Sequence, residues 1–429
     1  MSEFIYPTID LFIYDIRDAL NTTDEEINNN LANFQNKLPP HTQLTDIPIE
    51  TEYLELLPNQ KTRDFKTNYD NKTLQGYYYP VRLNDTYCLQ IDCSIDNKIE
   101  PQPLQAWQTI KSFIEQQLNN NKATLGKTWL LSACIPNFSQ QSHQKIAQDS
   151  YNYLFKEQDW QNNLREEKPF LDGKIFELWH HNPSTQETHH VIIIIYNKIE
   201  QEPTIANFYT DWLGLFCYQH KIFCSYYQSR LIKQTLLKFY RQIETKKQQI
   251  KTRSLDQKLA EIKDILENYT TQLPKLNFQK EIVEINLTNY QRRLKEIKTK
   301  LTTSNSLPFF SKFIKLSRQK YLLQISKDHE NMEIGLRLLE SNINLIRSQI
   351  EAEKAKGDRT FQALVTIVGT GTAVNSLIDY DGKKCQAIVK LLSEQNTWCD
   401  NNLTQIIVFP MTMILIFGIL GLGIKSLFR

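Results

Sequence analysis

The stretch EAEKAKGDRTFQALVTIVGTGTAVNSLIDYDG, residues 351–382, changes character in its middle, and this change decides how the fold is interpreted. Its first third is charged and helical in pattern. Residues 360–378 then carry no charge, and acidic residues return at Asp379 and Asp381. A helix of this length spans about 28 Å, close to the hydrocarbon core of a bilayer. The sequence therefore predicts that a charged helix continues directly into a first transmembrane helix.

A second uncharged stretch, NNLTQIIVFPMTMILIFGILGLGI at 401–424, is much more apolar. It predicts a second transmembrane helix and cytoplasmic tail over 403–429, with an outer loop over 379–402. The Thr, Gly and Asn residues of the first stretch indicate that it faces protein or water rather than lipid. A buried helix of a soluble domain is the alternative for that first stretch.

Basic residues on the inner side of both stretches predict that both termini are cytoplasmic. The expected location is the cell's inner (plasma) membrane, with several passes and the lipid bilayer as a partner. Cys385 and Cys399 would then lie in an outer loop, where they are candidates for a disulfide. Two free thiols are the alternative.

Apolar residues before the first stretch recur at alternating spacings of four and three, the 3.5-residue repeat of a coiled coil. This pattern predicts a stalk helix over 310–359. The same rhythm over 229–309 stops at Pro274 and resumes at Val283, which predicts a pair of shorter antiparallel helices. A solvated bundle without partner chains is the alternative for this pair. The stalk positions are Ile325, His329, Met332, Leu336, Leu339, Ile343, Ile346 and Ile350.

Residues 1–228 predict a cytoplasmic head of α+β or α/β class with a mixed sheet. A Thr23–Glu26 capping box opens a helix, and one hairpin is expected to turn at Asn84–Asp85. IFELWHH and HHVIIIIY form a second hairpin. The head has a net charge of −11, whereas residues 229–302 have a net charge of +9. Because basic and apolar residues share heptads there, solvated helix faces are expected rather than a nucleic-acid partner.

Four histidines, His180, His181, His189 and His190, flank the loop of the second hairpin. Histidine is a common metal ligand, so they are candidates for a metal site, and a pair of hydrogen-bonding histidines is the alternative. No GxSxG, HExxH or glycine-rich dinucleotide pattern occurs, and no enzyme activity is predicted. A membrane-tethered enzyme that uses these histidines is a third interpretation.

The layout of head, helix pair, stalk and two spans resembles the CorA superfamily of two-span divalent-cation channels. That family carries Gly-Met-Asn at the outer end of its first span, and this chain has TAVNSLIDYDG there, with Asn375 after Ala373 and Val374. The resemblance implies a homopentamer with the first span around the axis, and a divalent cation as the ion. The pore-lining candidates are Leu364, Thr366, Ile367, Thr370, Gly371, Val374 and Asn375.

The function expected from sequence is therefore a homo-oligomeric ion channel that an unknown cytoplasmic ligand gates through the head. The altered filter is compatible with a stress or defence effector. The alternative is a membrane-anchored coiled-coil sensor or scaffold without transport activity. The polar first span favours the channel, because a simple anchor has no need of several Thr residues.

Overall fold

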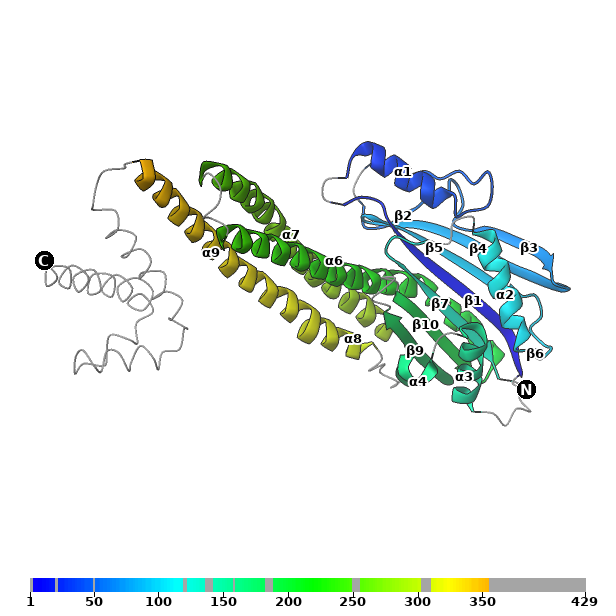
Figure 1. Ribbon diagram of the computed structural model, residues 1–429. Helices are drawn as coiled ribbons and strands as arrows, with labels where there is room; N and C mark the ends of the chain where they lie inside the picture. Colours follow the sequence, from blue (N-terminus) through cyan, green and yellow to red (C-terminus); the bar gives the residue numbers. More distant parts are fainter. Residues whose placement is uncertain are drawn as a thin grey trace, which may run out of the picture. The chain divides into compact units, whose positions relative to one another are not determined.

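The computed structural model describes residues 3–19, 22–48, 51–118, 122–135, 142–156, 159–181, 188–248, 255–301 and 310–354. The chain divides into two compact units. The first unit comprises Met1–Thr235 with Gln272–Met332, and the second comprises Leu236–Thr271 with Glu333–Arg429. Figure 1 shows the strands and helices of the described part.

The first unit contains a mixed sheet with the order β2-β4-β5-β1-β7-β10-β9-β8, in which β3 also pairs with β4 and β6 with β1. The β7–β10 pair is parallel, and the other described pairs are antiparallel. The strands are β1 (Glu3–Ile16), β2 (Leu54–Glu55), β3 (Arg63–Tyr69), β4 (Lys72–Leu83), β5 (Thr86–Ile95), β6 (Gln102–Pro103), β7 (Gly126–Cys134), β8 (Leu164–Phe170), β9 (Gly173–His181) and β10 (Thr188–Tyr196).

The long helices follow the last strand of the sheet in the chain, and some of the short helices lie between its strands in sequence (Figure 1). The helices are α1 (Asp24–Gln35), α2 (Gln105–Gln117), α3 (His143–Leu154), α4 (Trp160–Asn163), the 3-10 turn η1 (Ile199–Gln201), α5 (Glu202–Ala206), α6 (Tyr209–Gln248), α7 (Leu255–Lys300), α8 (Ser311–Leu316), the π-helical turn η3 (Ser317–Leu322) and α9 (Leu323–Lys354).

The central strand β1 is buried on both faces, because its side chains alternate between two layers of helices. Ile9, Leu11 and Ile13 belong to the core that α2 and α3 cover. On the opposite face, the Tyr14 hydroxyl donates a hydrogen bond of 3.0 Å to the carbonyl of Leu213 in α6. The sheet is therefore the middle layer between α2 and α3 on one side and the start of α6 on the other.

Two local predictions for the head are confirmed. Thr23 and Glu26 form the capping box that begins α1. Strands β4 and β5 pair up to Leu83 and Thr86, which leaves Asn84 and Asp85 as the turn. Asn84 has a φ of 51°, a conformation that asparagine tolerates better than most residues. The α+β class, the mixed sheet and the long helices thus agree with the sequence.

Pro274 does not end a helix, because α7 continues through it. Its neighbours Leu273 and Leu276 are buried, whereas Pro274 itself lies on the exposed side. Packing of the flanking leucines holds the helix together, although the proline lacks the N–H that would donate to the preceding turn. The interruption of the heptad pattern therefore marks a solvent-facing position rather than a helix boundary.

In the second unit, segments of α6, α7 and α9 pack through the expected seam. Leu339, Ile343 and Ile346 of α9 are buried, as are Ile243 of α6 and Ile262 of α7. The amide of Asn342 also donates a hydrogen bond of 3.1 Å to Glu244. The 4-3 spacing therefore identified the buried face of α9 in this unit.

The structure corrects the predicted transmembrane helices. In the described ranges, no helix has both the length and the apolar character that a bilayer crossing requires. The long helices are instead amphipathic, with charged residues throughout α7 and α9. By this finding, the prediction that the chain is a multi-pass protein of the plasma membrane was wrong. The two proposed spans, 360–378 and 403–429, and the loop between them lie outside the described residues.

Candidate functional site

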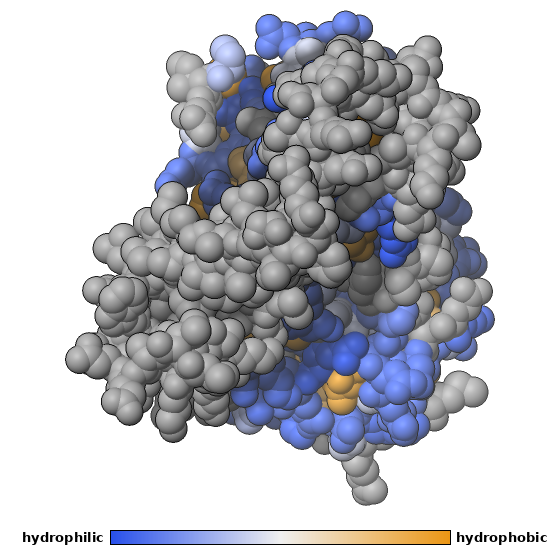
Figure 2. All heavy atoms as spheres, turned by 60° about the vertical axis from the view of Figure 1, so that its left-hand side comes forward, coloured by the Kyte–Doolittle hydropathy of each residue, from blue (hydrophilic) through white to orange (hydrophobic). Residues whose placement is uncertain are grey.

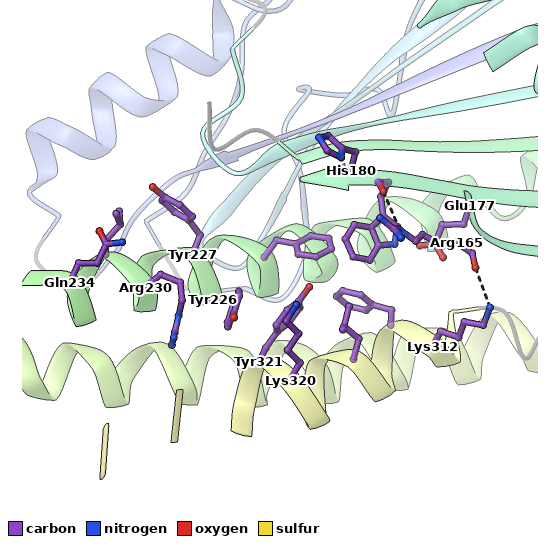
Figure 3. A pocket seen from close by; sticks show the side chains of 15 residues that line it. Arg165, Glu177, His180, Tyr226, Tyr227, Arg230, Gln234, Lys312, Lys320 and Tyr321 are labelled. Atoms are coloured by element: carbon purple, nitrogen blue, oxygen red, sulfur yellow. Dashed lines mark hydrogen bonds between the residues drawn. The ribbon is translucent and has the colours of Figure 1, made fainter. Parts of the chain in front are cut away.

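A pocket of about 1000 Å³ lies in the first unit, between the sheet edge formed by β8 and β9 and the helices α6 and α8 with the turn η3. Figure 3 shows its side chains. Five elements from three separate parts of the chain thus meet at one place. The lining residues are Arg165, Glu177, Trp179, His180, Phe223, Tyr226, Tyr227, Arg230, Leu231, Gln234, Lys312, Phe313, Leu316, Lys320 and Tyr321.

Helix α6 presents one continuous face to the pocket. Its pocket-facing residues are one, three or four positions apart, so their side chains project from the same side of the helix. They are Phe223, Tyr226, Tyr227 and Arg230. The ring of Tyr226 stacks on that of Tyr321, with centroids 4.2 Å apart and an interplanar angle of 28°. The aromatic rings therefore form a pre-packed wall.

Further rings extend this wall toward the sheet. Phe223 contacts Trp179 of β9 at a centroid distance of 5.2 Å and Phe313 of α8 at 5.3 Å. Phe223, Phe313 and Tyr321 are buried, whereas Trp179 is partly exposed. Flat rings that are already in contact offer a stacking surface at a small cost in side-chain entropy.

Cationic groups surround the rings. The guanidinium of Arg165 lies over the Trp179 ring, 4.4 Å from its centroid, and its Nε donates to the Trp179 carbonyl at 3.2 Å. Lys312 Nζ donates to the carbonyl of Arg165 at 3.1 Å. Arg230 lies 5.0 Å from the Tyr226 ring and pairs with Asp328. Lys320 is exposed on η3.

Glu177 is the one carboxylate among the residues that line the pocket. Burial raises its pKa to about 7, against the hydrogen bond from Gln219 and the charges of Arg165 and Lys312. Its pKa is thus close to neutrality, whereas Arg165, Arg230, Lys312 and Lys320 are cationic side chains. The pocket therefore favours a negatively charged ligand.

The turn η3 is π-helical, and it supplies Lys320 and Tyr321 to the pocket. A π-helical turn contains one residue more than the equivalent α-helical turn, and such turns are frequent at functional sites. Here the turn lies between α8 and α9, so the pocket is built partly on the segment that begins α9.

The three candidate histidines whose side chains are described do not form one site. His180 is exposed and lines the pocket. His189 packs against Phe155, the residue that follows α3, with centroids 4.7 Å apart. His190 points to the opposite face of the sheet, where Thr128 lies between it and His220 at 2.8 and 2.9 Å. His180 and His189 are directly opposite each other in the β9–β10 pair. His190 is separated from them because successive side chains of a strand point to opposite faces.

The hydrogen-bonded alternative therefore describes His190, although its partner is Thr128, which also contacts His220, rather than another histidine of the hairpin. Among the described residues, no three His, Cys, Asp or Glu side chains are placed to hold a metal ion. The side chain of His181 is outside the described part of the chain.

Other predicted sites also lie outside the described residues. These are the possible disulfide between Cys385 and Cys399 and the seven pore-lining candidates, namely Leu364, Thr366, Ile367, Thr370, Gly371, Val374 and Asn375. Self-association as a homopentamer and the divalent cation stay predictions. The pocket was not predicted from the sequence, although the spacing of aromatic residues over 223–227 was a signal for it.

The fold and the pocket define a class by architecture alone: an α+β head whose sheet edge and helices enclose an aromatic and cationic pocket. The chain matches no protein-family model, no curated protein and no solved structure. Its function is therefore argued from the pocket.

Proposed function

We propose that the chain is a ligand-binding sensor whose pocket in the first unit takes a small anion that carries a flat ring. The observation that carries the proposal is the composition of the pocket wall, in which aromatic rings alternate with cations. Its volume, about 1000 Å³, is at the upper end of the range for small-molecule sites. The ligand is a small molecule rather than a macromolecule.

The anionic part of the ligand is expected to contact Lys312 and Lys320. Lys312 reaches the pocket from α8 and lies 3.7 Å from the buried Glu166, so its position is constrained. Lys320 is exposed at the pocket edge. Two ammonium groups, eight residues apart on α8 and η3, provide donors for a phosphate or carboxylate.

The ring of the ligand is expected to stack near Tyr226 and Trp179. Both are already engaged by guanidinium groups, Arg230 on Tyr226 and Arg165 on Trp179. A ring that enters this wall gains contact with aromatic faces and with guanidinium planes together. This combination accounts for selectivity toward aromatic anions over simple ones.

Sensing follows from the position of η3. Ligand contacts to Lys320 and Tyr321 act on a π-helical turn, and conversion of such a turn to α-helix changes the register of the residues that follow. The next helix is α9, which begins at Leu323. The proposal therefore assigns the pocket the role of setting the conformation of α9, as the sensor alternative expects.

Binding is tested with phenyl phosphate as the probe, by titration calorimetry on the full chain. Phenyl phosphate is expected to bind more tightly than inorganic phosphate or phenol, because it alone carries both parts. Replacement of Lys320 by Met should weaken binding about tenfold, the effect of losing about 1.4 kcal/mol from a charge-assisted contact.

The matched control is Lys315→Met. Lys315 is an exposed lysine of α8 that does not line the pocket, so this variant should bind like the parent. The proposal is wrong if all three probes fail to bind, or if Lys315→Met and Lys320→Met weaken phenyl phosphate equally.

A further inference from the structure

Two buried cysteines meet on the face of the sheet that α6 covers. Cys88 of β5 and Cys217 of α6 are fully buried, and their sulfur atoms are 3.9 Å apart. Both are free thiols, and the Cys88 thiol donates to the Cys217 sulfur. A disulfide bond is about 2 Å long, so an approach of roughly 2 Å joins them.

A surface ion pair lies next to the two thiols. Lys221 follows Cys217 by one helical turn of α6 and forms an ion pair with Asp85, in the turn that precedes β5. The Lys221 side chain is 9% exposed, whereas that of Asp85 is 51% exposed. The ion pair therefore reaches from the interior to the surface, and we expect its opening to admit a small oxidant to the thiols.

The two thiols have different acidities. Burial alone would raise the pKa of Cys217, but the hydrogen bond from Cys88 and the positive charge of Lys221 outweigh it and lower that pKa. The pKa of Cys88 is well above its usual value, because of burial and then because of the neighbouring Cys217. Cys217 is thus the nucleophile of the pair, and Cys88 is the thiol that keeps its proton.

We propose that Cys88 and Cys217 form a modification site that a small peroxide oxidises to a disulfide. The Cys217 thiolate attacks one oxygen of hydrogen peroxide, the O–O bond breaks, and hydroxide leaves. Cys88 then attacks the sulfur of the resulting sulfenic acid, the S–O bond breaks, and its proton leaves with the hydroxyl as water. Two thiols and one peroxide give one disulfide and two waters.

Burial determines which oxidant the site takes. Glutathione disulfide needs direct access of its sulfur atoms to a thiolate, and neither Cys88 nor Cys217 has exposed surface. A peroxide of about the size of water does not need such exposed surface, so burial does not exclude it. The product links β5 covalently to α6, the helix that continues from the sheet toward the pocket wall.

The experiment is peroxide oxidation of the full chain, followed by unfolding, alkylation with iodoacetamide and peptide mass spectrometry. The expected product is a peptide pair linked through Cys88 and Cys217, which dithiothreitol reverses. Glutathione disulfide should not produce it. Cys88→Ser should leave a sulfenic acid at Cys217, which dimedone traps when the oxidised chain is unfolded in its presence, and Cys217→Ser should leave Cys88 reduced.

Two further variants test the electrostatic argument. Lys221→Met should slow the oxidation about tenfold, the effect of a one-unit rise in the pKa of the reacting thiol. Cys224→Ser, a change to a partly exposed cysteine of α6, should leave rate and yield unchanged. Recovery of alkylated Cys88 and Cys217 at peroxide concentrations that oxidise an unfolded sample of the same chain would overturn the proposal.

Discussion

Glu177 of β9 lies directly opposite Glu166 of β8, and both residues are buried, with 2% and 3% of their surface exposed. Two like charges at facing positions of an antiparallel pair destabilise it. Burial raises the pKa of each carboxyl, and the charge of Glu177 raises that of Glu166 further. The sheet edge that forms the pocket is therefore more stable when a proton is bound.

The first prediction concerns Glu177→Gln and pH. The pKa of Glu177 is raised from 4.5 to about 7, so between these values the native state keeps a proton that the unfolded state has lost. Its contribution to stability is thus complete below pH 4.5 and falls until pH 7, by on the order of 3 kcal/mol. The variant should be more stable than the parent at pH 8, but not at pH 4.5.

Urea unfolding at both pH values measures this difference. Burial also raises the pKa of Asp10 to about 7. The contribution of Glu177 is therefore obtained from the difference in unfolding free energy between parent and variant, and not from the parent curve alone. Glu167→Gln is the control, because Glu167 pairs with Lys174 at 2.6 Å and is not buried. Equal effects of the two substitutions at pH 8 would contradict the prediction.

The second prediction concerns Thr128, whose hydroxyl lies between His190 Nδ1 and His220 Nε2. Burial lowers the pKa of His190 to about 3 and that of His220 as well, so both rings are neutral near pH 7. Thr128→Val removes the hydroxyl and leaves two buried ring nitrogens without this partner. The expected loss is about 2 kcal/mol of unfolding free energy, measured by urea denaturation.

Thr128→Ser is the matched variant, because it keeps the hydroxyl and removes one methyl group. It should lose less stability than Thr128→Val, although valine has nearly the shape of threonine. If Thr128→Val is the more stable of the two, the hydroxyl does not support the histidines.

The third prediction compares two glycines. Gly126 at the start of β7 has a φ of 153°, and a Cβ atom there would lie 2.3 Å from Nδ1 of the fully buried His220. Gly126→Ala should therefore cost more than about 1 kcal/mol, through overpacking and backbone strain. In Gly214 of α6, the nearest atom to an added Cβ is Nε of the flexible Arg293, at 3.3 Å.

Gly214→Ala is thus expected to stabilise the protein by up to about 1 kcal/mol, as alanine does within a helix. Thermal unfolding of both variants checks the contrast. A stable Gly126→Ala variant would show that His220 can move away from β7.

Much of the head could be predicted because its signals are local. Thr23 and Glu26 are three residues apart, and the turn at Asn84–Asp85 is flanked by alternating strands, so neighbouring residues alone define these features. The seam of α9 likewise follows from a repeat along one helix. The effect of Pro274 depends instead on which side of α7 faces outward, and this side is set by packing.

The uncharged stretches near the C-terminal end led to a wrong prediction of membrane-spanning helices, because length and hydropathy alone supported it. In the described residues no helix has those properties. The pocket was not predicted, because its residues come from separate parts of the chain. Arg165, Tyr226 and Tyr321 are far apart in the chain, and no motif joins them.

The sequence by itself determined the α+β class of the head with its mixed sheet, the turn and cap residues, and the apolar face of α9. These depend on interactions within a few residues, which periodicity reports directly. Only the tertiary structure decided that Cys88 meets Cys217, that Glu166 faces Glu177, and that His189 and His190 serve opposite sides of one sheet. Such pairs depend on strand order and on which helix covers which face, and neither is encoded in local spacing.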